Sequence, residues 1–347
     1  SPDCSKDHNS IQLVHQAYGR AYQLPNLNAY NENCATIGFV LFNKRMLDIT
    51  AEAKYADILE LAFYNGIMST ISLDGKEFFY TNPLRVVNDE PFEMRWSRQR
   101  QPYISCFCCP PNTVRMIAES PRYAYSISEE GLYVHLYGGN TVDTQLTDGS
   151  QIKLHQQTNY PWDGAIQIII DKAPADQIPL FLRIPGWVKE PSIKLNGKSI
   201  DEAVQPQSYF KIQRRWSAGD KIEMELPMST QLIETNPFVE ETRNQVAVKR
   251  GPIVYCLESI DLPDNINLMD VGVKRNQQFT NRFDSVLLGG VTVLEGVALQ
   301  QAQQSWQDTL YREISKEQPR EMNIRLIPYY AWDNRGKSEM TVWMPVW

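Results

Sequence analysis

Hydrophobic residues recur at helical spacing in two segments between residues 33 and 68. The first stripe contains Cys34, Ala35, Ile37, Leu41 and Phe42, and the second contains Tyr55, Ile58, Leu59, Ala62 and Phe63. Apolar positions three and four residues apart predict amphipathic helices, the second of them over residues 51–68. We expect Asp48 and Thr50 to cap the second helix and Gly66 to end or bend it.

Shorter elements are predicted between the second helix and residue 120. Residues 67–72 and 78–81 are apolar and are predicted to form two short strands around a turn at 73–76. Residues 112–120 are predicted to form a third helix, because two prolines stand just ahead of it. Asn112 is the expected cap of that helix.

Beyond Pro121 the hydrophobic pattern changes to a period of two. Apolar and polar residues alternate in many short runs, including 131–137, 152–155, 165–170 and 221–226, with Gly- and Asn-containing turns between them. Many short strands separated by turns predict β-sandwiches. We therefore expect a multidomain α+β chain with helices in 1–119, one sandwich in 120–235 and a second in 236–347. The strand at 338–347 is a candidate to return to the first sandwich.

Length and composition narrow the class of protein. A chain of 347 residues is long for one compact core, and contents of 42% hydrophobic and 22% charged residues are those of an ordinary globular protein. The net charge of −7 and the absence of a long basic run argue against a nucleic-acid partner. No apolar run approaches the roughly 20 residues of a membrane-spanning helix. The chain opens at Ser1 without a hydrophobic signal segment, as expected of a processed protein or an excised piece.

The cysteines are unevenly distributed. Cys106, Cys108 and Cys109 fall within four positions, and Glu32 and Cys34 stand two positions apart upstream. Adjacent cysteines do not readily form a disulfide with each other, because the bond demands a particular geometry. Three thiolates and a carboxylate are ligand types that a tetrahedral zinc site accepts. From these residues alone a structural zinc site, a reactive site and a disulfide involving Cys106 are all open.

Several short motifs carry a resemblance to a known family. They are Tyr22-Gln-Leu-Pro-Asn26, Tyr30-Asn-Glu-Asn-Cys34, Tyr80-Thr-Asn-Pro-Leu84, Cys108-Cys-Pro-Pro-Asn112, Arg183-Ile-Pro-Gly-Trp187 and Lys249-Arg-Gly-Pro252. Together they resemble glycoside hydrolase family 127, the β-L-arabinofuranosidase-like proteins, along essentially the whole chain. The resemblance implies an (α/α)6 barrel followed by two β-sandwiches. Residues 1–119 would then be the C-terminal part of a catalytic barrel whose N-terminal portion is missing from this chain.

The resemblance also implies a chemistry for the cysteines. It assigns Glu32, Cys34, Cys108 and Cys109 as Zn²⁺ ligands, and Cys108 as the nucleophile in addition. A free thiol has a pKa of about 8.5 and is mostly protonated at neutral pH, whereas a metal-bound thiol is deprotonated. Attack by the thiolate on an anomeric carbon, followed by hydrolysis of the thioglycoside, gives net retention.

One position departs from the family pattern. The family's general acid/base is a glutamate sixteen residues before the zinc-binding glutamate, and Gln16, next to His15, stands there. An amide cannot perform general acid/base catalysis, which typically contributes about 10² to 10⁴-fold. Three explanations are open: an acid from elsewhere (Glu60, Asp89 or Glu90), a different substrate, or sugar binding with little chemistry.

A few further residues are candidates for substrate binding. Tyr80 matches a substrate-contacting tyrosine of the family, and its phenol can bond a sugar hydroxyl. His15 has a pKa in the working range, and Glu60 lies on a helix expected to face the barrel axis. Trp187 and the aromatic segment 329–332 are expected in cores and domain contacts rather than against a sugar.

These observations lead to three hypotheses of function. The first is a zinc-dependent, retaining glycoside hydrolase acting on a plant-polysaccharide furanoside, which the resemblance implies to be a β-L-arabinofuranoside or a rarer pectic sugar such as aceric acid. The second is a catalytically silent carbohydrate-binding protein with a structural zinc site. The third is a β-sandwich module whose helices dock a separate N-terminal chain. The resemblance implies a bacterial cytoplasmic or periplasmic location.

Overall fold

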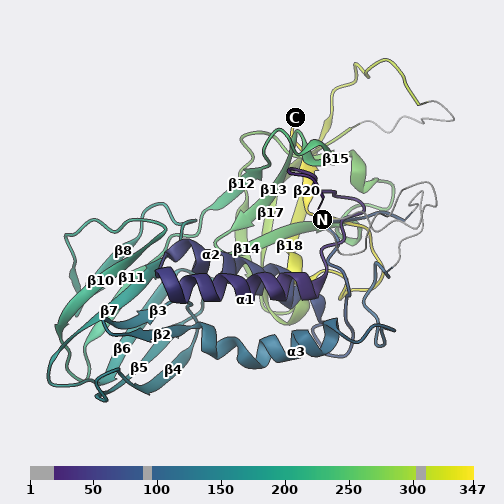
Figure 1. Ribbon diagram of the computed structural model, residues 1–347. Helices are drawn as coiled ribbons and strands as arrows, with labels where there is room; N and C mark the ends of the chain where they lie inside the picture. Colours follow the sequence, from purple (N-terminus) through teal and green to yellow (C-terminus); the bar gives the residue numbers. More distant parts are fainter. Residues whose placement is uncertain (1–18, 89–95, 302–309) are drawn as a thin grey trace.

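Helices gather in the first third of the chain and strands make up most of the rest (Figure 1). The structure, a computed structural model, describes residues 19–88, 96–301 and 310–347. Its principal helices are α1 (Asn33–Thr50), α2 (Ala53–Leu61) and α3 (Cys109–Glu119). The predicted mixed α+β class is confirmed. Among the described helices, none has the length and apolar character needed to cross a membrane.

The buried face of α1 differs from the predicted stripe. Leu41 and Phe42 are 47% and 58% exposed, so the prediction was wrong at both positions. The helix instead buries a face that includes two polar residues, Asn33 and Asn43. These asparagines are accommodated by hydrogen bonds: Asn33 donates to the hydroxyl of Thr113, and Asn43 donates to a carbonyl within the helix. Buried polar residues that are satisfied in this way hide a helix face from a hydrophobicity pattern.

The junction between the first two helices also differs from expectation. Asp48 and Thr50 belong to the last turn of α1, which ends at Ala51 in a left-handed conformation, so the predicted cap of α2 is wrong. Asp48 instead forms an ion pair with Lys44. Beyond α2 the chain continues through a π-helical turn at Ala62–Ile67, so Gly66 does not end the helical segment.

The short elements after α2 also differ from their predicted types and bounds. A 3-10 turn, Met68–Thr70, occupies part of the first predicted strand, and only an isolated bridge joins Ile71 to Phe78. The third helix begins at Cys109, which places Pro110 in its first turn, where a missing amide proton costs little. Its N-cap is Cys108 rather than Asn112, so that capping prediction is wrong.

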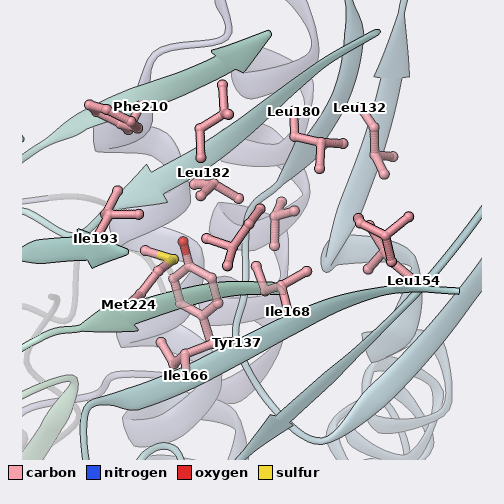
Figure 2. Packing of buried hydrophobic residues seen from close by; sticks show 14 of the residues in the cluster. Leu132, Tyr137, Leu154, Ile166, Ile168, Leu180, Leu182, Ile193, Phe210 and Met224 are labelled. Carbon is pink, nitrogen blue, oxygen red and sulfur yellow. The ribbon is translucent and has the colours of Figure 1, made fainter. Parts of the chain in front are cut away.

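Two sheets in the first β region enclose one hydrophobic core. One has the order β10-β7-β3-β2 and the other β4-β5-β6-β11-β8-β9. The strands are β2 (Tyr125–Ser128), β3 (Gly131–Val134), β4 (Asn140–Gln145), β5 (Gln151–Thr158), β6 (Ala165–Lys172), β7 (Gln177–Ile184), β8 (Ser192–Leu195), β9 (Lys198–Ser199), β10 (Ser208–Arg215) and β11 (Lys221–Glu225). Figure 2 shows side chains of both sheets meeting between them, among them Leu132 and Leu180 from one and Ile168 and Met224 from the other. Alternate residues point inward, as the period of two predicts.

The remaining strands form one ten-stranded network. They are β1 (Arg85–Val86), β12 (Thr230–Glu234), β13 (Gln245–Arg250), β14 (Ile253–Glu258), β15 (Val271–Gly272), β16 (Thr280–Asp284), β17 (Val291–Gln300), β18 (Arg320–Pro328), β19 (Met340–Thr341) and β20 (Trp343–Pro345). β19 pairs with β14 and β20 pairs with β13. The expectation that 338–347 returns to the first sandwich is therefore wrong. The division into domains at residues 119 and 235 stays a prediction.

The segment around β1 ties the helical region to this sheet. Its Arg85 is in register with Thr341 of β19. The buried ring of Phe79 stacks on Trp332, with the ring centroids 5.0 Å apart. The guanidinium of Arg100 lies over the ring of Phe79 and donates a hydrogen bond to the backbone carbonyl of Trp332. The residues just before β1 are therefore held by the C-terminal part of the chain.

Candidate metal centre and active site

Two helices begin at the same place. Glu32 directly precedes α1, and Cys34 is the second residue of that helix. Cys108 directly precedes α3, and Cys109 is its first residue. The first turn of a helix presents free amide protons and the positive end of the helix dipole, which favour carboxylates and thiolates. Figure 1 shows α1 and α3 running alongside each other, so both helix starts act on one group of side chains.

A buried hydrogen-bond chain fixes the two helix starts. The Nδ2 atom of Asn33 donates to the Oγ1 atom of Thr113 at 2.5 Å. The same hydroxyl donates to the carbonyl of Cys109 at 3.0 Å. Asn33 stands between Glu32 and Cys34, so this chain sets the position of both relative to α3.

The ligand atoms of Glu32, Cys34, Cys108 and Cys109 all lie within 4.8 Å of one another. The Sγ atom of Cys109 is 3.4 Å from that of Cys34 and 3.8 Å from that of Cys108. The Oε1 atom of Glu32 is 3.9 Å from the sulfurs of both Cys108 and Cys109. A tetrahedral site with Zn–S bonds of about 2.3 Å places its sulfurs roughly 3.8 Å apart. The donor set and its spacing therefore fit a zinc ion.

The three thiols differ in their acidity. Hydrogen bonds from the Cys109 thiol and from Asn112 lower the pKa of Cys34 to about 6. The same bond to Cys34 raises the pKa of Cys109, and burial raises the pKa of Cys108. Of the three thiols, Cys34 is therefore the first to lose its proton.

Tyr80 lies beside Cys108. Its hydroxyl is 3.5 Å from the Sγ atom of Cys108 and 3.7 Å from that of Cys106. Its ring stacks on Trp96 with centroids 3.8 Å apart and meets the edge of Tyr30. Burial raises the pKa of the phenol, so the hydroxyl stays protonated and can donate. The structure thus brings this predicted substrate-binding residue to the predicted nucleophile.

Asn112 is a site residue that the sequence did not reveal as one. Its Nδ2 atom donates to the Sγ atom of Cys34 at 3.1 Å. The sequence spacing could have indicated this role. Residues three apart on a helix share a face, and Asn112 follows Cys109 by three positions. The assumption that α3 begins at Asn112 concealed it.

Glu60 belongs to a different cluster. Its side chain is 2% exposed and lies against the strands of the first β region. Oε1 accepts hydrogen bonds from Arg183 and Tyr160, and Oε2 accepts one from Trp187 at 3.1 Å. The structure does not bring Glu60 to the cysteines. Trp187 was expected in a core or a domain contact, and its bond to Glu60 joins the first β region to α2.

Four of the sequence-predicted candidates lie outside the described residues. They are His15, Gln16, Asp89 and Glu90. The position of the general acid/base therefore stays a sequence prediction.

Comparisons with known proteins point to one family. Three domain models match in order: the catalytic domain of a β-L-arabinofuranosidase of family 127 at residues 4–122, the middle domain at 131–228 and the C-terminal domain at 230–345. These matches place the chain among the glycoside hydrolases. It belongs to glycoside hydrolase family 127, as the sequence motifs predicted.

Individual relatives match nearly all of this chain and are themselves longer. A non-reducing end β-L-arabinofuranosidase of Bifidobacterium longum subsp. longum is 33% identical over 95% of this chain and 51% of its own length. A solved structure described as a glycoside hydrolase is 43% identical with a TM-score of 0.93, covering 99% of this chain and 58% of that one. A family 127 β-L-arabinofuranosidase from Geobacillus stearothermophilus T6 is 40% identical with a TM-score of 0.86, covering 94% and 51%. The chain spans about half the length of the relatives it matches.

Proposed function

We propose that this chain carries the metal centre and the nucleophile of a retaining glycoside hydrolase that acts on β-L-arabinofuranosides. The observation that supports this most directly is the convergence of Glu32, Cys34, Cys108 and Cys109, with Tyr80 beside Cys108. The substrate class is supported by the names of the relatives, two of which are β-L-arabinofuranosidases. A rarer pectic sugar such as aceric acid is the other substrate that the family resemblance suggests.

The cluster of four would hold Zn²⁺, because three thiols and a carboxylate at these spacings are a zinc donor set. A bound zinc ion would keep the thiols deprotonated at neutral pH. Cys108 is the partly exposed member at the start of α3, whereas Cys109 is fully buried. A sugar can therefore reach the sulfur of Cys108 and not that of Cys109, which favours Cys108 as the nucleophile.

The reaction then proceeds in two displacements at the anomeric carbon. In the first, the sulfur of Cys108 forms a bond to that carbon as the bond to the leaving oxygen breaks, and the leaving oxygen takes a proton from a general acid. In the second, a water oxygen bonds to the carbon, the carbon–sulfur bond breaks, and the water proton returns to the same group. Two inversions leave the configuration retained. The Cys108 thiol donates a hydrogen bond to the Tyr80 hydroxyl, and once the thiol has lost its proton the phenol would donate to the sulfur and hold it in place.

The general acid/base must satisfy a requirement that Glu60 does not meet. Its two oxygens accept hydrogen bonds from Arg183, Tyr160 and Trp187, so it cannot readily offer a proton to a leaving group. We therefore exclude Glu60, and Asp89 and Glu90 remain the acids that the sequence offers for this role. Gln16 at the family position is the observation that keeps the alternative, a carbohydrate-binding protein with a structural zinc site, in consideration.

The missing portion of the barrel is the proposed partner of this chain. The α1 side chains Phe39, Leu41, Phe42 and Ile49 are between 47% and 78% exposed. A row of large apolar residues on a helix is normally covered. We infer that N-terminal helices of a longer protein cover this face and complete an (α/α)6 barrel. The greater length of the relatives supports this inference.

Replacement of Cys108 by Ser in the full-length protein tests the proposal. We expect the wild-type protein to contain zinc and to release L-arabinose from a β-L-arabinofuranoside with retention, as followed by NMR. Cys108→Ser should lower the rate by at least about 10³-fold, because the two-step route depends on the sulfur. Cys256→Ser, which alters a buried cysteine of β14, is the matched control and should leave the rate near that of the wild type.

The possible results separate the two candidate functions. A Cys108→Ser variant as active as the wild type contradicts the nucleophile. A zinc-containing wild-type protein that binds furanoside glycans and cleaves none of them supports the carbohydrate-binding alternative.

A further inference from the structure

Each thiol of the cluster contacts a polar group outside the four ligands, and two residues, Tyr80 and Asn112, supply these groups. The sulfur of Cys108 lies 3.5 Å from the hydroxyl of Tyr80, and that of Cys109 lies 3.7 Å from the carbonyl of Tyr80. The sulfur of Cys34 instead receives the side-chain amide of Asn112 at 3.1 Å. Tyr80 therefore contacts the two cysteines at the start of α3, whereas Asn112 of α3 contacts the cysteine of α1.

We infer that Asn112 is a positioning residue that holds Cys34 as a metal ligand by donating a hydrogen bond to its sulfur. The inference rests on the proposed function, because it assumes that the cluster binds a metal. In this contact Asn112 presents Nδ2, a hydrogen-bond donor that does not coordinate a cation, to the sulfur of Cys34. Groups of this kind orient the ligand and typically change metal affinity about 10 to 100-fold when removed.

The placement of Asn112 explains why Cys34 needs such a partner. Cys34 comes from α1, whereas Cys108, Cys109 and Asn112 all come from the start of α3. The bond from Asn112 therefore joins the two halves of the site without involving the metal. Because it spans the helices at the ligand atom itself, it restricts the rotamer of Cys34 before a metal arrives. Preorganised ligands bind with a smaller loss of conformational entropy.

The chemistry of the contact points in the same direction. A coordinated thiolate carries negative charge and accepts hydrogen bonds, and a neutral amide N–H donates to it without competing for the metal. An amide donor also withdraws electron density from the sulfur. Loss of the donor should therefore change the spectrum of a thiolate-bound metal as well as its affinity.

The test compares three full-length proteins: wild type, Asn112→Leu and Val114→Ala. Leucine has the same branching and number of side-chain heavy atoms as asparagine but donates no hydrogen bond. Val114 is 51% exposed on the same helix, so its variant controls for a general disturbance of α3. Zinc affinity is measured by competition with a chromophoric chelator, and the thiolate-to-metal absorption bands are recorded after loading with Co²⁺.

We expect Asn112→Leu to bind zinc about 10 to 100-fold more weakly and to shift the cobalt–thiolate bands, while Val114→Ala matches the wild type. Circular dichroism of the metal-free proteins shows whether α3 is retained. Equal affinity and unchanged bands in Asn112→Leu overturn the inference, as does an equal loss in both variants. A wild-type protein that takes up neither Zn²⁺ nor Co²⁺ contradicts the proposed metal site itself, which is a different result.

Discussion

His135 shows how a single buried residue can control the acid stability of the protein. Its side chain is 1% exposed, with Nε2 bonded to the hydroxyl of Ser126 at 2.7 Å and Nδ1 to that of Tyr209 at 2.5 Å. Burial lowers the pKa of His135 to about 3, with Lys44 and Arg183 adding to the effect. The folded protein therefore keeps this imidazole neutral at pH values where the unfolded chain protonates it.

This difference predicts a loss of stability in mild acid. The unfolded chain binds the extra proton below its ordinary pKa of about 6.5, so stability is present above that pH and falls as the pH drops toward 3. At pH 5 the loss amounts to about 2 kcal/mol. His135→Phe removes the titrating group. The variant should have a lower free energy of unfolding than the wild type. This difference, measured by urea unfolding, should therefore become smaller as the pH falls from 7.5 to 5.

Phe181→Leu on β7 is the matched control, since that ring is buried in the same β region and does not titrate. The difference in its free energy of unfolding from the wild type should stay the same between pH 7.5 and pH 5. A constant deficit of His135→Phe across the pH range would show that burial does not lower the pKa of His135 as described.

At the level of elements, α2 is joined to β7 by a buried ion cluster. Arg183 is 0% exposed and contacts Asp57 at 2.6 Å and Glu60 at 2.5 Å, while its Nε donates to the carbonyl of His135. Burial raises the pKa of Asp57, Arg183 opposes that rise, and the neighbouring carboxylate of Glu60 adds to it. The arginine is therefore needed to compensate one buried and one half-buried acid.

Arg183→Leu should destabilise the protein by about 3 to 5 kcal/mol, because it leaves Asp57 and Glu60 without their cation. Denaturant unfolding measures the loss. Arg282→Leu serves for comparison: its partner Glu295 lies 2.9 Å away, the two side chains are 49% and 42% exposed, and the expected change is about 0 to 1 kcal/mol. Similar losses in both variants would mean that the Arg183 cluster contributes no more than a surface pair.

The elements also show what a sequence pattern can and cannot predict. Two of the three helices and the many short strands follow from apolar periodicity, and the third helix follows from the two prolines ahead of it. The cysteine cluster was suggested by ligand spacing in residues 32–34 and 108–109. The buried face of α1 was hidden because Asn33 and Asn43 are polar residues whose hydrogen bonds form only after folding. The contact of Asn112 with Cys34 depends on where α3 begins, which periodicity places only within a few residues.

For the whole molecule, the exposed face of α1 provides a test of the proposed barrel. Phe42 is 58% exposed in this chain, and we propose that a longer protein covers it. In that longer protein, Phe42→Glu should cost about 1 to 3 kcal/mol of stability, because a charge would be buried in an apolar contact. Val286→Glu, at a site that is 88% exposed in the turn after β16, should change stability by about 0.5 kcal/mol or less. Thermal melting of both variants measures these changes in stability. A Phe42→Glu variant as stable as the wild type would indicate that this face stays open to solvent.

The stacking of Phe79 on Trp332 limits how this protein can be divided or recombined. Phe79 immediately precedes Tyr80, whose hydroxyl lies against Cys108, so the far end of the chain helps to set the position of a residue at the centre of the site. A chimera that exchanges the C-terminal sheet between relatives must therefore exchange residues 79–86 with it. The catalytic and C-terminal regions are matched as partners, and neither is a freely interchangeable module.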